Sequence, residues 1–250
     1  MDMLDSSDPT AVALVQAIRT GNLITLESLL ADRRSLAATR ISLGSERTAT
    51  LLHVATDWPG YFPGGPAVVR ALIGAGADPN ARTTGGEFAE TPLHWAASSD
   101  DADVAEALIE GGADLQADRG SIGTPLDNAV GYGCWHVARL LVSRGARVDK
   151  LWHAAALGMM ARLRELIAAD PAPSGGDINE AFWQACHGGQ RRAAEYLLAR
   201  GADINSRPGY TRKSALDVAP GPDTRREILV SWLRSKGAAP TAGPGAASAE

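Results

Sequence analysis

A sequence pattern returns at a fixed distance of 33 residues near the middle of this chain. Residues 91–97 have the sequence Thr-Pro-Leu-His-Trp-Ala-Ala, and residues 124–130 have the sequence Thr-Pro-Leu-Asp-Asn-Ala-Val. Each copy is followed at the same distance by a second motif, Gly-Ala-Asp at 112–114 and Gly-Ala-Arg at 145–147. A period of this size indicates a repeat protein, in which each unit packs against its neighbours in the chain.

The two motifs in register resemble those of the ankyrin repeat family. The resemblance covers residues 10–238 and implies an all-α fold, an ankyrin-repeat solenoid of about seven helix-turn-helix repeats with a concave groove. Residues 1–9 are expected to be a flexible lead. Residues 239–250 are expected to be a disordered tail, because Ala, Gly, Pro and Ser bury too little surface to order a chain. No sheet is predicted, because the fingers between repeats lack alternating β-branched runs.

The motif residues have physical roles at the ends of the helices. A Thr hydroxyl can cap exposed helix N–H groups, and Pro at the first helical position gives up no hydrogen bond. The Gly of Gly-Ala-Asp ends the second helix, where a left-handed residue is favoured. The resemblance implies that His53 and His94 hydrogen-bond between neighbouring turns, and we expect Asp127 and Asp217 to do the same.

Two repeats depart from the regular spacing. In the second repeat the second-helix leucine lies 17 positions after the motif alanine, against 12 in the third, so residues 57–65 contain a five-residue insertion. The fifth repeat begins at Leu151, only 25 residues after the equivalent position of the fourth, so eight residues of its finger are missing.

Composition and charge exclude several classes of function. The net charge is −5, from 24 basic and 29 acidic residues, and no basic run is long enough to follow a phosphate backbone. We therefore expect no nucleic-acid partner. We also expect no membrane partner, because no apolar run approaches the roughly 18 residues that span a bilayer. Two isolated cysteines, Cys134 and Cys186, and a start without a signal-peptide profile favour a cytoplasmic protein.

The first hypothesis for function is a non-catalytic protein-interaction module, because no motif of a known enzyme mechanism is present. No cofactor is expected. The family resemblance implies partner contacts in the groove, and exposed aromatic residues in the inserted loop favour binding of another protein. An alternative for the helical aromatic residues, including Trp95 and Trp183, is that they fill space between repeats. The predicted binding residues are Trp58, Tyr61, Phe62, Trp95, Ser98, Asn128, Tyr132, His153, Trp183, Gln184 and His187.

The alternative hypothesis is a small-molecule or catalytic pocket in the groove, under the loop of residues 57–65. Aromatic walls with a few polar groups are what small ligands favour. In such a site His153 or His187 is the candidate general base, and Asp57 is the candidate partner carboxylate. No metal is expected, because no third ligand accompanies the two histidines.

Overall fold

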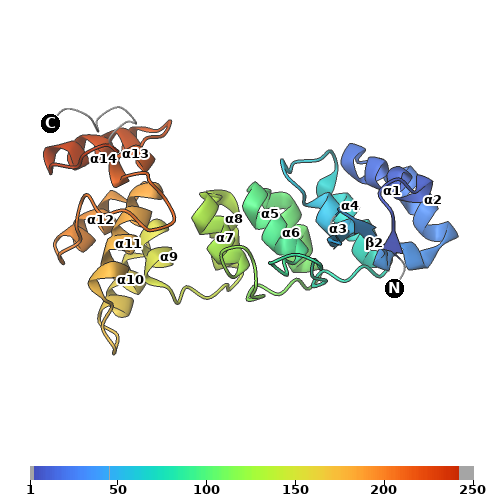
Figure 1. Ribbon diagram of the computed structural model, residues 1–250, viewed down its shortest axis with the longest axis horizontal. Helices are drawn as coiled ribbons and strands as arrows, with labels where there is room; N and C mark the ends of the chain where they lie inside the picture. The colour runs from blue at the N-terminus through green and yellow to red at the C-terminus, as the bar shows by residue number, and fades with distance from the viewer. Residues whose placement is uncertain (1–2, 45, 242–250) are drawn as a thin grey trace. The chain divides into compact units, whose positions relative to one another are not determined.

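The computed structural model describes residues 3–44 and 46–241, and the chain divides into two compact units, residues 1–147 and 148–250 (Figure 1). The described residues form fourteen α-helices in seven successive pairs. This confirms the predicted all-α ankyrin solenoid fold. The division into two units falls in the shortened finger before the fifth repeat, where the sequence predicted one continuous array. The two units are described separately below.

The first unit contains four helix pairs, and one helix of each pair belongs to each of two layers. Helices α1, α3, α5 and α7 pack against one another in succession, and α2, α4, α6 and α8 form the second layer in the same order. Alanine and leucine side chains fill the space between the layers. The helices are α1 (Pro9–Thr20), α2 (Leu23–Asp32), α3 (Leu51–Ala55), α4 (Gly65–Gly74), α5 (Pro92–Ser99), α6 (Ala102–Glu110), α7 (Pro125–Tyr132) and α8 (Trp135–Ser143), with a 3-10 helix η1 (Arg34–Ala38).

Capping at the start of α5 explains why the Thr-Pro-Leu-His motif recurs. The Thr91 backbone N–H donates to Nδ1 of His94 at 3.1 Å, and the other ring nitrogen lies 3.0 Å from the carbonyl oxygen of Gly123 in the next finger. His53 makes the same contacts with Thr50 and with the carbonyl oxygen of Glu90. Both histidines are buried, so the interpretation of the motif histidine as a link between neighbouring repeats is confirmed.

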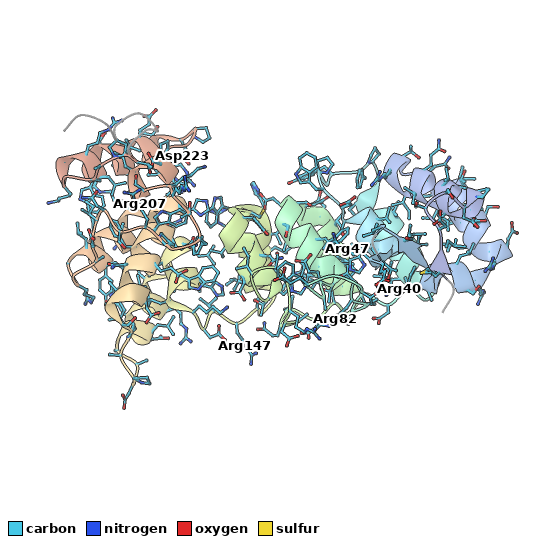
Figure 2. All side chains as sticks on the ribbon, in the orientation of Figure 1. Arg40, Arg47, Arg82, Arg147, Arg207 and Asp223 are labelled. Carbon is cyan, nitrogen blue, oxygen red and sulfur yellow. The ribbon has the colours of Figure 1, made fainter. Side chains whose placement is uncertain are left out.

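Side chains hydrogen-bond to the backbone both within a finger and across to a neighbouring finger. Arg82 donates to the carbonyl oxygens of Ala89 and Asp118 at 2.8 and 2.6 Å, and Arg40 donates to the carbonyl oxygen of Arg82 at 2.6 Å (Figure 2). Asn80 donates to Gly112, whose φ of +93° suits glycine, and so links its finger to the end of α6. Arg40 and Arg82 therefore hold the fingers together.

A small sheet in the first unit corrects the expectation that no sheet forms. Strand β1 (Met3–Leu4) is parallel to β2 (Arg40–Ser42), which is antiparallel to β3 (Thr48–Thr50). The finger between α2 and α3 is long enough to fold back on itself, and backbone pairing in such a hairpin needs no long alternating run. The predicted lead of residues 1–9 thus contains a strand at residues 3–4 and the first residue of α1. Residues 1–2 and 242–250 lie outside the described part of the chain, and with them most of the predicted tail.

The second unit contains three helix pairs around α11. Helix α11 packs against α9, α12 and α13, and its Phe182 is fully buried. Ser174 caps the start of α11 by accepting a hydrogen bond from the backbone N–H of Asp177, whose carboxylate accepts in return from Ser174. The helices are α9 (Leu151–Ala156), α10 (Met160–Ile167), α11 (Gly175–His187), α12 (Arg191–Leu198), α13 (Ala215–Val218) and α14 (Thr224–Ser235).

None of the helices in the described part of the chain combines the length and the apolar character that crossing a bilayer requires.

Candidate functional site

The inserted loop of residues 57–65 exposes two large aromatic side chains. Trp58 is 77% exposed and Tyr61 is 64% exposed. Phe62, the third predicted residue of the loop, is half-buried, and the guanidinium of Arg19 lies 5.9 Å from the centre of its ring. Trp58 and Tyr61 therefore present aromatic surface to solvent, whereas Phe62 fixes the base of the loop against α1.

Hydrogen bonds to the turn between α5 and α6 hold the loop in place. The Tyr61 backbone N–H donates to the carboxylate of Asp101 at 2.6 Å, and the Tyr61 hydroxyl donates to the carbonyl oxygen of Asp100 at 2.5 Å. Asp101 is itself buried, and its other carboxylate oxygen accepts from the backbone N–H of Val104 at the start of α6. One buried carboxylate thus caps a helix and fixes the loop.

Four of the predicted binding residues lie around Glu90, a residue that was not predicted to belong to a site. Its carboxylate accepts hydrogen bonds from the indole N–H of Trp95 at 3.0 Å and from the amide of Asn128 at 3.2 Å. The Asn128 amide also donates to Ser98 at 3.3 Å. The Tyr132 hydroxyl lies 3.2 Å from the Ser121 hydroxyl, and the backbone N–H of Ser121 donates to Glu90.

The environment of Glu90 favours its charged form. Burial by itself raises the pKa of the carboxyl group, but hydrogen bonds from Ser121 and Asn128 together with the nearby ring of His94 outweigh this effect, and the pKa lies below its ordinary value of 4.5. The group is therefore a carboxylate at neutral pH. In the sequence it stands directly before the Thr91 cap, a position that does not by itself mark a site residue.

In the second unit, Trp183, Gln184 and His187 lie on one turn of α11 and meet the finger before α13. The Trp183 indole N–H donates to the carbonyl oxygen of Lys213 at 2.9 Å, and the Gln184 amide donates to the Tyr210 hydroxyl at 3.1 Å. The rings of Trp183 and His187 lie 5.2 Å apart. These contacts tie α11 to the next repeat and fill space between the two.

The two histidines of the second unit differ in their surroundings. His153 is only 1% exposed, and its ring lies 4.1 Å from that of Trp152. His187 is partly buried, and burial, followed by the positive charges of Arg226 and Lys213, lowers its pKa to about 4. His187 is consequently neutral at pH 7 and a weaker base than an ordinary histidine.

Burial separates the predicted binding residues into two groups. Residues that are buried can meet a partner only if the repeats open, whereas exposed residues are accessible in the structure; for both groups the role in binding stays a prediction. The buried residues are Asn128, His153, Trp183 and Gln184, and those with exposed or half-buried side chains are Trp58, Tyr61, Phe62, Trp95, Ser98, Tyr132 and His187.

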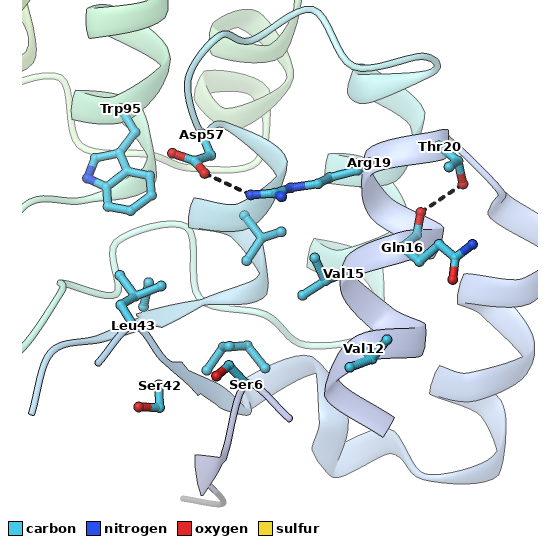
Figure 3. Close-up of a pocket in the computed structure, with 13 residues that line it drawn as sticks. Ser6, Val12, Val15, Gln16, Arg19, Thr20, Ser42, Leu43, Asp57 and Trp95 are labelled. Carbon is cyan, nitrogen blue, oxygen red and sulfur yellow. Dashed lines mark hydrogen bonds and ion pairs between the residues drawn. The ribbon is translucent and has the colours of Figure 1, made fainter. Parts of the chain in front are cut away.

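A pocket of about 470 Å³ lies in the first unit between α1, the β2–β3 hairpin, α3 and α5 (Figure 3). An ion pair between Arg19 and Asp57, with 3.0 Å between nitrogen and oxygen, stands at its edge. Most of the lining side chains are apolar. They are Ser6, Val12, Val15, Gln16, Arg19, Thr20, Ile41, Ser42, Leu43, Ala49, Val54, Asp57 and Trp95.

Residues 3–44 and 46–241 contain no group of three or more His, Cys, Asp or Glu side chains arranged to hold a metal ion. Cys134 and Cys186 are free thiols, and both are buried. Burial raises the pKa of the Cys134 thiol to about 11 and raises that of Cys186 as well. Neither thiol therefore has the thiolate character of a nucleophile at neutral pH.

A family model for ankyrin repeats, with three copies of the repeat, matches residues 52–150. The crystal structure of the human ASB11 ankyrin repeat domain is similar in fold, with a TM-score of 0.52 and 23% sequence identity; the match covers 87% of this chain and 96% of that chain. No curated protein sequence shows significant similarity. Residues 52–150 therefore contain ankyrin repeats, which are generally protein-interaction modules, and the chain has the fold of an ankyrin repeat solenoid.

Proposed function

We propose that this ankyrin repeat protein is a non-catalytic interaction module that binds another protein through the loop of residues 57–65 and the neighbouring end of α5. The observation that carries the proposal is the exposure of Trp58 and Tyr61 on an insertion that the repeat fold does not require. Aromatic side chains of this kind supply much of the binding energy at protein interfaces.

The rigidity of the loop supports this function. Because Tyr61 is hydrogen-bonded to Asp100 and Asp101 through its hydroxyl and its backbone, the loop is ordered before a partner arrives. A preordered loop loses less conformational entropy on binding than a mobile one does, so more of the contact energy remains as affinity. The Trp58 side chain is 77% exposed and can bury this surface against a partner, which makes it the principal contact residue of the proposal.

The test is native mass spectrometry of the full chain, isolated gently from its source cells, with and without Trp58→Ala. We expect a complex with one polypeptide for the unaltered chain, and its loss in the variant without a change in the unfolding midpoint. Ile24→Ala is the matched control, because Ile24 is an exposed apolar residue on α2 outside the loop. Retention of the same partner by the Trp58 variant would place the interaction elsewhere.

The catalytic alternative receives less support from the same residues. His153 is enclosed by its neighbours, His187 is a weak base, and Asp57 is paired with Arg19. General acid-base catalysis is most effective when the pKa lies near the working pH, and His187 is far from that condition.

A reducing compartment is a further part of the proposal. Its support is that Cys134 and Cys186 are both free thiols. A cytoplasmic location is consistent with this, and fractionation of the source cells tests it.

A further inference from the structure

We infer that the pocket between α1, the β2–β3 hairpin and α3 binds an uncharged, mainly apolar small molecule. At about 470 Å³, the pocket falls within the range of roughly 300–1,000 Å³ typical of small-ligand sites. The inference does not depend on the loop of residues 57–65 binding a protein, because different side chains carry it.

The floor of the pocket is formed by buried apolar side chains from three elements. Ile41 of β2, Ala49 of β3 and Val54 of α3 are buried in the unit, and each also lines the pocket. Because these residues belong to the packed core, the floor is rigid. A ligand that enters meets a surface already formed, and binding needs no reorganisation of the repeats.

Trp95 forms a fixed wall on the side of α5. Its indole N–H donates to Glu90, and its ring lies edge-on to His53 with 5.0 Å between ring centres. These two contacts satisfy the polar atom of the indole and set the orientation of the ring. The apolar part of the indole is therefore available to a ligand, without a polar group that the ligand must match.

The rim carries apolar side chains that remain exposed. Val12 of α1 is 48% exposed and Leu43, just after β2, is 45% exposed, and both line the pocket. An apolar ligand would cover both side chains as well as the floor. Removing such surface from water favours binding.

The charges at the edge define the class of the ligand. Arg19 and Asp57 neutralise one another across 3.0 Å, and the remaining polar side chains of the lining are uncharged (Figure 3). A charged ligand would lose hydration against the apolar walls and would have to break this pair to gain a counter-charge. An uncharged ligand leaves the pair intact, and Ser6, Ser42 and Gln16 of the lining offer it hydrogen bonds.

The test uses the neutral dye Nile red and the full chain. We expect saturable binding of one dye per chain, with increased dye fluorescence. Val15→Trp fills the pocket and should weaken binding by about tenfold or more. Ile24→Trp adds the same side chain on α2, outside the pocket, and should leave binding unchanged.

Two further measurements keep the test decisive. Val12→Glu introduces a charge at an exposed position of the rim, where folding tolerates it, and should also weaken binding; unfolding midpoints show that each variant is folded. Anionic anilinonaphthalene sulfonate should bind more weakly than Nile red. The inference would be overturned if the unaltered chain showed no saturable binding of Nile red. It would also be overturned if the pocket variants bound the dye as well as the unaltered chain does, or if the anionic dye bound more tightly.

Discussion

The carboxylate of Glu90 accepts a hydrogen bond from the indole N–H of Trp95 at 3.0 Å, and its other oxygen accepts from the backbone N–H of Ser121 at 2.9 Å. The same oxygen accepts from Asn128 of α7, and the carbonyl oxygen of Glu90 lies 3.0 Å from the ring of His53 of α3. One finger residue therefore contacts three successive repeats of the first unit.

Replacing Glu90 with glutamine should destabilise the first unit by about 1–3 kcal/mol, because an NH2 group that cannot accept a hydrogen bond takes the place of one of the two accepting oxygens. Urea unfolding measures the loss as a lower midpoint. Glu87→Gln is the matched control, since Glu87 is exposed in the same finger, and it should have little effect. A Glu90 variant as stable as this control would show that the network adds nothing to stability.

The stabilisation by Glu90 should depend on pH. Because the pKa of the folded carboxyl group lies below its ordinary value of 4.5, the stabilisation is fully present above that value and is lost as the pH falls through the folded pKa. The difference in unfolding midpoint between the unaltered chain and Glu90→Gln should therefore be constant near neutrality and shrink below about pH 4.5. A difference that stays the same in acid would contradict the assignment of a charged carboxylate.

A second dependence on pH should come from His53. Burial lowers its pKa to about 4 from 6.5, so the unfolded chain takes up a proton between these values while the folded chain does not. Stability should fall as the pH decreases through this window, by up to about 1.4 kcal/mol per pH unit. Urea midpoints between neutral pH and about pH 5 measure the slope, and His53→Gln should make it shallower. An unchanged slope would show that His53 does not carry the effect.

Asp101 should support both α6 and the inserted loop. Asp101→Ala removes the cap of α6, at a cost of about 1 kcal/mol, and also removes the acceptor for the Tyr61 amide. Asp101→Ser keeps a capping oxygen but is too short to serve both groups, so it should be the more stable of the two variants. Hydrogen exchange at the Tyr61 amide should accelerate in both. Slow exchange there in either variant would mean that other contacts hold the loop.

Asp100 permits a test of backbone strain. It has a φ of +55° at the end of α5, and its carboxylate accepts from the backbone N–H groups of His136 and Val137 at 2.9 and 3.0 Å. Asp100→Ala and Asp100→Gly both lose these hydrogen bonds, but only the alanine variant is destabilised by the left-handed backbone conformation. The glycine variant should therefore be more stable by about 1 kcal/mol in thermal unfolding. Equal stability would argue against strain at this position.

Local features of the sequence were sufficient to predict the repeats. The Thr91 cap, the His94 link and the glycine that ends α6 act within one helix or between adjacent turns, and the structure has all three. The inserted loop was found in the same way, by counting residues between motif positions. The proposal that Trp58 and Tyr61 contact a partner remains a prediction.

Packing between repeats was beyond the reach of the sequence. Asn128 and Gln184 were predicted to bind in a groove, yet both are buried: Asn128 meets Ile122 of the finger before its helix, and Gln184 meets Tyr210 of the finger after its helix. Glu90 was missed because nothing in its immediate neighbours reveals that Trp95, Ser121 and Asn128 converge on it. The short sheet was missed because β1 pairs with a strand far along the chain, and each strand has only two or three residues.

The sequence by itself thus determined the seven helix pairs, since helix capping is set by residues a few positions apart and the repeats share a motif that can be read directly from the sequence. The tertiary structure alone decided which polar side chains are buried and where the pocket forms. The walls of that pocket come from residues as distant as Val12 and Trp95. Their meeting depends on how whole repeats pack, and local sequence preferences do not specify that packing.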